Sequence, residues 1–198
     1  MVPRVRCSWQ VDFPSMLMDS MSSMMEVRVI QCDRNRAGAI LGILNEAIEN
    51  STALYDYVPR TPAMMSDWFD AKERARYPII GVTDQNDRLL GFGSYGSFRN
   101  WPAYKYTVEH SIYVERTCRG QGIGKRLLGE VITAAKRQQF HCLIGGIDSQ
   151  NAASIGLHRQ FGFQQCAHIR QVGFKFGRWL DLQLYQLLLE TPAHPVAG

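Results

Sequence analysis

The most informative stretch for the fold is residues 119–125, which read Arg119-Gly120-Gln121-Gly122-Ile123-Gly124-Lys125. It follows a run typical of a β-strand at 104–114 and opens a run typical of an amphipathic helix at 122–138. Exposed N–H groups at the start of a helix bind phosphate, and glycines let the backbone approach the oxygen atoms closely. The stretch therefore predicts a phosphate-binding turn between a strand and a helix.

Two common nucleotide-binding patterns do not fit this stretch. A P-loop needs glycine at the position of Arg119 and serine or threonine at that of Arg126. A dinucleotide fingerprint needs GxGxxG, whereas the loop reads GxGxG, and no acidic residue follows about twenty positions later at a strand end. Two alternatives are left: another kind of pyrophosphate loop, or a glycine-rich turn without a ligand.

Outward from the loop, the chain alternates between strand and helix patterns. Asp33 is the expected cap of the first helix, and Gly162 is the expected end of the last. This order predicts an α/β (α+β) fold with a mixed, mostly antiparallel sheet and helices on both faces. Strand patterns fall at 27–31, 78–83, 88–98, 104–114, 141–147, 163–173 and 179–189, and the later helix patterns at about 64–76, 122–138 and 151–161.

No linker divides the sequence, so we expect one domain over residues 25–190. Residues 1–24 contain charged side chains and lack the apolar run of a signal peptide, and we expect a poorly ordered extension there. Residues 191–198 are the expected tail. No run reaches the roughly 18 apolar residues of a membrane span, so the sequence predicts a cytoplasmic protein without a membrane partner.

Charge and cysteine usage narrow the class of ligand. The chain has 22 basic and 18 acidic side chains, a net charge of +4, and its basic cluster surrounds the glycine loop. A small phosphorylated ligand explains that cluster better than a nucleic acid does. The five cysteines are scattered and never spaced as CxxC, which predicts reduced thiols and no metal site.

Three segments together resemble a known family. Arg119 to Gly124 fit the pyrophosphate loop of the GNAT acetyltransferase superfamily, Arg/Gln-x-x-Gly-x-Gly/Ala. Two longer segments resemble the phosphinothricin and methionine sulfoximine N-acetyltransferases, and the resemblance spans roughly residues 26–190. These segments are Thr107-Val108-Glu109-His110-Ser111-Ile112-Tyr113-Val114 and Val172-Gly173-Phe174-Lys175-Phe176-Gly177-Arg178-Trp179-Leu180-Asp181.

The resemblance implies a GNAT fold, acetyl-CoA as co-substrate and a homodimer. It implies an N-acetyltransferase for the α-amine of a small molecule such as methionine sulfoximine, methionine sulfone or phosphinothricin. It places coenzyme contacts at the backbone of Ile112, Tyr113 and Val114, at the glycine loop, and at Asn151 and Ser154 where the last helix begins.

Acetyl transfer to an amine needs a base, and Glu109 is the candidate on the central strand. The alternative is a carboxylate that pairs with the substrate ammonium or with His110 without proton transfer. His158 occupies the position where many GNAT enzymes carry the tyrosine that protonates the leaving thiolate. Tyr113 is a substitute for that role, and a histidine of the core is the other interpretation of His158.

The candidate substrate-binding residues precede or lie on the central strand. An arginine there could pair with a carboxylate or phosphinate, and an aromatic ring could wall the pocket. The alternative is an exposed hairpin loop. The candidates are Arg99, Asn100, Trp101, Thr107, Glu109 and His110.

Two other functions stay open at this point. One is a GNAT enzyme that acetylates protein N-termini or another amine. The other is a non-catalytic acyl-CoA sensor, which an eroded glycine loop or a missing carboxylate would favour, and the sequence has neither.

Overall fold

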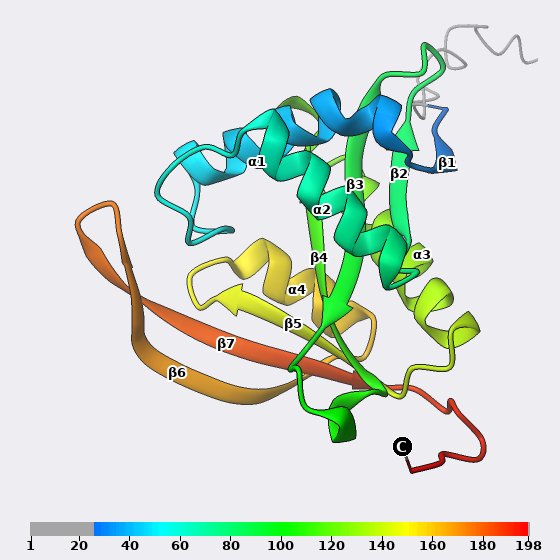
Figure 1. The fold of residues 1–198 in the computed structure, drawn as a ribbon. Helices are drawn as coiled ribbons and strands as arrows, with labels where there is room; N and C mark the ends of the chain where they lie inside the picture. Colours follow the sequence, from blue (N-terminus) through cyan, green and yellow to red (C-terminus); the bar gives the residue numbers. More distant parts are fainter. Residues whose placement is uncertain (1–25, 198) are drawn as a thin grey trace, which may run out of the picture.

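The computed structural model describes residues 26–197, so the extension expected at residues 1–24 lies outside the described residues. Seven strands form one sheet in the order β1-β2-β3-β4-β5-β7-β6 (Figure 1). Neighbouring strands are antiparallel except for the parallel pair β4 and β5, which confirms the predicted mixed sheet. The strands are β1 Arg28–Gln31, β2 Ile79–Thr83, β3 Leu89–Ser97, β4 Thr107–Val114, β5 Cys142–Asp148, β6 Gln164–Lys175 and β7 Arg178–Leu188.

Four α-helices cover the two faces of the sheet, as predicted. Helices α1 (Ala37–Asn50) and α2 (Pro62–Arg74) bury Ile40, Leu44 and Phe69 against one face. Helices α3 (Ile123–Arg137) and α4 (Ala152–Gln160) pack on the other face, where the buried side chains of α3 recur every three or four residues. The site described below therefore lies between two separate hydrophobic cores.

The parallel strands β4 and β5 pair over only part of their length. The register runs from Thr107 opposite Cys142 to His110 opposite Gly145 and then stops. Beyond His110, β4 continues to Val114 along β3 alone. Residues 111–114 consequently present one unpaired backbone edge toward β5, and an opening forms between the two strands.

The long β6–β7 hairpin projects away from the rest of the sheet (Figure 1) and is fastened to the loop after α1. The buried ammonium of Lys175 donates to three carbonyl oxygens at the end of α1, those of Ile48 (2.6 Å), Ser51 (3.0 Å) and Leu54 (2.7 Å). A hydroxyl from that loop, on Tyr57, donates to a hairpin carbonyl at 2.6 Å. These contacts fix the loop that walls the site.

Two elements, α2 and β4, begin two or more residues away from the expected start. Helix α2 begins at Pro62 rather than 64, because Thr61 caps the helix and proline fits its first turn. Strand β4 begins at Thr107 rather than 104, because residues Pro102–Tyr104 form a short 3₁₀ turn. Both differences come from proline, whose fixed φ suits the first residue of a helix or of a 3₁₀ turn.

Candidate functional site

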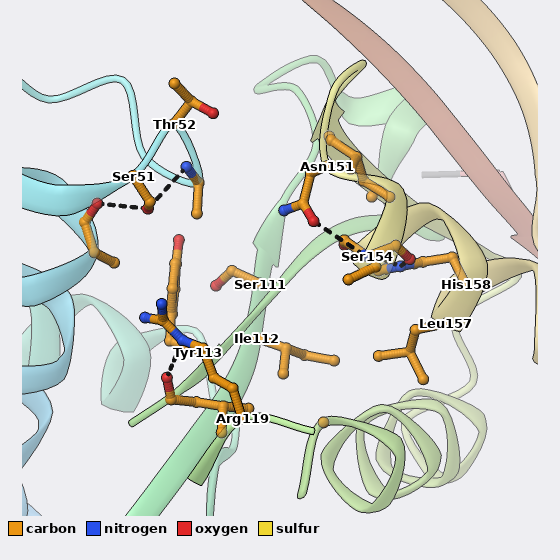
Figure 2. Close-up of a pocket in the computed structure, with 18 of the residues that line it drawn as sticks. Ser51, Thr52, Ser111, Ile112, Tyr113, Arg119, Asn151, Ser154, Leu157 and His158 are labelled. Carbon is orange, nitrogen blue, oxygen red and sulfur yellow. Dashed lines mark hydrogen bonds between the residues drawn. The ribbon is translucent and has the colours of Figure 1, made fainter. Parts of the chain in front are cut away.

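A cavity of about 960 Å³ occupies the opening between β4 and β5. Side chains alternate across a strand, so Ser111 and Tyr113 face α1 while Ile112 faces α3 and α4. All three line the cavity, and Figure 2 shows them pointing to opposite sides. The cavity therefore passes through the sheet from one face to the other.

Two backbone N–H groups of β4 point into this cavity. Along a strand the N–H and C=O groups of alternate residues point to opposite sides. The N–H of Glu115 bonds to the carbonyl of Leu90 on β3, so the N–H groups of Ile112 and Val114 point the other way, toward the opening. Within residues 26–197 neither has a hydrogen-bond partner, so each can donate to a carbonyl or amide oxygen in the cavity.

The glycine loop forms the end of the cavity at the start of α3. Gly120 (φ 78°) and Gly122 (φ 82°) take left-handed conformations that favour glycine, and Gly122 is the N-cap without a side-chain hydrogen bond. The first helical bond runs from the N–H of Arg126 to Gly122 at 3.0 Å. The N–H groups before it have no intrahelical partner, which makes this turn suited to a phosphate.

Not every side chain of the loop faces the cavity. Lys125 lines it, whereas the amide of Gln121 donates to the carbonyl of Thr117 at 3.0 Å and Ile123 is buried in the α3 core. Arg119 donates to the carbonyl of Val114 at 3.2 Å and pairs with Glu46 of α1. Gln121 and Ile123 can thus contribute only their backbone, and Arg119 ties β4 to α1.

Two predicted coenzyme residues meet at the start of α4. Asn151 is the N-cap, and its carboxamide oxygen accepts from the N–H of Ser154 at 3.1 Å. Both line the cavity beside Leu157 (Figure 2). The amide nitrogen of Asn151 is left available toward the cavity.

The buried pair His110 and His158 closes the cavity on the α4 side. The Nε2 atoms lie 2.9 Å apart, and Nδ1 of His158 lies 2.7 Å from the carbonyl oxygen of Ser154. Because a carbonyl only accepts, His158 carries its proton on Nδ1, and its Nε2 accepts from His110. Burial lowers the pKa of both rings, so both are neutral at neutral pH. Gly145 leaves the space that the two rings fill.

Glu109 lies on the opposite face of β4 from His110, so the structure does not group these two predicted residues. A Cβ on Gly146 would lie 3.2 Å from Oε1 of Glu109, with Leu182 and Leu184 behind it. The residue keeps exposed surface, yet desolvation against β5 and β7 raises the pKa of its carboxyl, and the charge of Arg99 opposes that rise. A raised pKa suits a base that works near neutral pH.

The predicted residues before β4 lie at a second, smaller hollow of about 410 Å³. Arg99, Asn100, Trp101 and Thr107 line it, and the exposed indole of Trp101 stacks on Tyr104. None of these four residues lines the larger cavity.

Several lining residues were missed by sequence reasoning. Ser51, Thr52 and Ala53, from the loop after α1, line the cavity, and Figure 2 shows Ser51 and Thr52 on the side of Tyr113. Burial raises the pKa of Tyr113 to about 12, so its hydroxyl keeps its proton at neutral pH. Nothing in the sequence of this small polar loop indicates that it lines a cavity. Its position depends on its hydrogen bonds to the distant β6–β7 hairpin.

Among residues 26–197, no three metal-ligating side chains of His, Cys, Asp or Glu gather at one place. In the same part of the chain, no helix is long and apolar enough to cross a membrane.

Comparison with known proteins gives consistent matches. The sequence model of the acetyltransferase (GNAT) family matches residues 45–163. The L-methionine sulfoximine/L-methionine sulfone acetyltransferase of Pseudomonas paraeruginosa is 46% identical over 151 residues, covering 76% of this chain and 88% of that protein.

Solved structures agree with these matches. An N-acetyltransferase of Staphylococcus aureus Mu50 gives a TM-score of 0.80 at 44% identity, over 82% of this chain and 98% of its own. A GNAT superfamily phosphinothricin acetyltransferase from Sinorhizobium meliloti, in complex with AcCoA, gives a TM-score of 0.82 at 32% identity, over 86% of this chain and 93% of its own.

Proposed function

Because this chain belongs to the acetyltransferase (GNAT) family, we propose that it acetylates the α-amine of methionine sulfoximine, methionine sulfone or phosphinothricin from acetyl-CoA. The observation that carries the proposal is the opening between β4 and β5. It joins a phosphate-binding helix start to free backbone donors, and the carboxylate of Glu109 lies beside Gly146 of its lining.

The residues present fit acetyl-CoA. The free N–H groups at the start of α3, with Lys125 beside them, suit the pyrophosphate, and a cradle of glycines with positive φ allows its close approach. The unpaired edge of β4 and the carboxamide of Asn151 suit the amides of the pantetheine arm. Bound there, acetyl-CoA supplies an activated acyl group.

Three protein groups carry the transfer. Glu109 accepts the proton that the acceptor ammonium must lose before its nitrogen attacks the thioester carbonyl. The N–H group of Ile112 or that of Val114 donates to that carbonyl oxygen as negative charge develops on it. The two groups lie two residues apart on β4, about 6.6 Å along the strand, so the other is left for an amide oxygen of the pantetheine arm. No acyl-enzyme is needed, since the amine attacks directly.

The leaving thiolate needs a proton, and two side chains of the cavity compete for that role. Both ring nitrogens of His158 are engaged and the neutral ring is a poor acid. Tyr113 keeps its proton at neutral pH and is aimed into the cavity. We therefore assign the proton donor to Tyr113, and a larger loss of kcat in Tyr113→Phe than in His158→Phe is the expected result.

A thiol-release assay tests the function. Purified protein and acetyl-CoA are mixed separately with the three proposed acceptors, the common amino acids, spermidine and a panel of N-terminal peptides. Turnover confined to the sulfoximine, sulfone or phosphinate compounds supports the proposal. Turnover on peptides alone would move the function to protein N-termini, and tight acetyl-CoA binding without turnover would indicate a sensor.

We also propose a homodimer that uses the β6–β7 hairpin. Between residues 169 and 179 of the hairpin, five large apolar side chains are between 41% and 59% exposed, which is more apolar surface than a monomer normally leaves in contact with water. They are Ile169, Val172, Phe174, Phe176 and Trp179. Light scattering after gel filtration should give twice the chain mass, and Trp179→Glu should give the monomer.

The proposed place of action is the cytoplasm, where acetyl-CoA is available. The four cysteines of the described residues are free thiols, which suits a reducing compartment.

A further inference from the structure

Two glycines are neighbours of Glu109 on the adjacent strands. Gly96 of β3 is directly opposite Glu109, and Gly146 follows on β5. The close approach of Oε1 to Gly146 shows that the carboxylate leans toward β5. Over Gly96, on the same face of the sheet, no side chain from the other strands of residues 26–197 comes within 4 Å of the position that a Cβ would take.

The ammonium of Lys72 covers Gly96 on this face of the sheet. Nζ of Lys72, from α2, lies 3.7 Å from the position of a Cβ on Gly96, and no other atom of residues 26–197, apart from Gly96 and its two chain neighbours, comes within 4 Å of that position. The ammonium donates to the carbonyl of Tyr95 at 2.5 Å. It also lies 5.4 Å from the ring centre of Trp68 and 5.7 Å from that of Tyr77.

The ammonium of Lys72 is only partly satisfied. An ammonium has three donors, and among residues 26–197 one hydrogen bond and no ion pair is found for Lys72. The three bonds of Lys175 to carbonyl oxygens use all the donors of that side chain, which explains its burial by structure alone. The partial burial of Lys72 is not explained in this way, because two of its three donors have no partner among the described residues.

A half-buried ammonium without a counter-ion is costly, and desolvation lowers the pKa of Lys72 to about 8. An anion bound beside it would offset that cost. The molecule that carries this anion must also present a group that can lie beside the carboxylate of Glu109. Gly96 and Glu109 are cross-strand partners, and the Cβ positions of such partners are only about 4.5–5.5 Å apart. An α-amino acid meets both demands, since its amine and its carboxylate are held one carbon apart.

We propose that Lys72 binds the α-carboxylate of the acceptor, beside the α-amine that Glu109 deprotonates. The inference rests on the proposed function and deepens it, because it restricts the acceptors to α-amino acids with a free carboxylate. Arg99 is the competing cation. Its exposed guanidinium lies at the smaller hollow and is suited to the outer end of the acceptor instead.

The test compares two acceptors that differ only in the carboxylate: methionine sulfone and its decarboxylated amine, methylsulfonylpropylamine. The wild-type enzyme should prefer the amino acid. In Lys72→Met, kcat/KM for methionine sulfone should fall about ten- to a hundredfold, the worth of a hydrogen bond to a charged partner, while that for the amine stays unchanged. Lys72→Arg should retain most of the preference, because the charge is kept.

The control is Lys136→Met, an exposed lysine near the end of α3, which should leave both acceptors unaffected. Thermal unfolding and the Kd of acetyl-CoA confirm that each variant is folded. Equal losses for the two acceptors in Lys72→Met, or loss of the preference in Arg99→Met instead, would overturn the assignment. So would a wild-type enzyme without preference. If wild-type enzyme acetylates neither compound, the proposed function itself has failed.

Discussion

Replacing Lys175 with methionine should loosen the wall of the cavity and lower stability. The ammonium is buried, and its three hydrogen bonds hold carbonyls of Ile48, Ser51 and Leu54. Hydrogen bonds of a charged group contribute about 1.5–3 kcal/mol each. They share one ammonium whose burial lowers its pKa, so part of this gain is offset by desolvation.

Methionine fills a similar volume and leaves three carbonyls without their donor. We therefore expect the free energy of unfolding to fall by about 2–4 kcal/mol, which in a domain of this size lowers Tm by about 5–15 °C. Circular dichroism during heating and urea titration measures both. Because residues 51–53 wall the cavity, the KM of the acceptor should also rise, while the Kd of acetyl-CoA changes little.

The exposed Lys136→Met is the matched control, with an expected change within about 0.5 kcal/mol. A loss as small as that in Lys175→Met would refute the reasoning, because it would mean that water replaces the ammonium at all three carbonyls without cost.

Three other predictions concern the remaining parts of the site. Glu109→Gln should lower kcat/KM by about 10²–10⁴-fold and remove the acidic limb of its pH profile. Since burial raises the folded-state pKa, this variant should be more stable than wild type at neutral pH, and that advantage should shrink as the pH falls through the raised pKa and be gone below the pKa of a free glutamate. Gly122→Ala places a Cβ at φ 82°, which costs about 1–2 kcal/mol and should weaken acetyl-CoA binding in calorimetry without changing the KM of the acceptor. Gly145→Ala would bring a Cβ to 2.9 Å from Cε1 of His110 and should cost about 1–3 kcal/mol by urea titration, whereas Gly156→Ala, with open space around it, should be neutral or stabilising. Equal stability of the two alanine variants would contradict the packing of the histidine pair.

The parts of the site that depend on neighbouring residues could be predicted from the sequence. The glycine loop joins a strand to a helix within a few residues, and Asn151 caps the next helix by the same local rules. The fold class followed from the order of the patterns. Strand alternation also dictates that Glu109 and His110 point to opposite faces, although assigning both to substrate binding ignored that consequence.

The parts formed by distant residues could not be predicted in this way. The pairing of β4 with β5 ends at His110, and no residue pattern in either strand indicates where the pairing stops. The ammonium of Lys175 bonds to a residue 127 positions away, and Lys72 meets Gly96 only because α2 lies across β3. Such contacts depend on how elements pack, which a single sequence does not specify.

The passage through the sheet has a kinetic consequence. If coenzyme lies toward α3 and α4 and the acceptor approaches from the side of Glu109, neither ligand blocks the entrance of the other. We then expect either to bind first, with intersecting double-reciprocal plots. Coenzyme A should inhibit competitively against acetyl-CoA and not against the amine, because the coenzyme and the amine enter from opposite faces of the sheet.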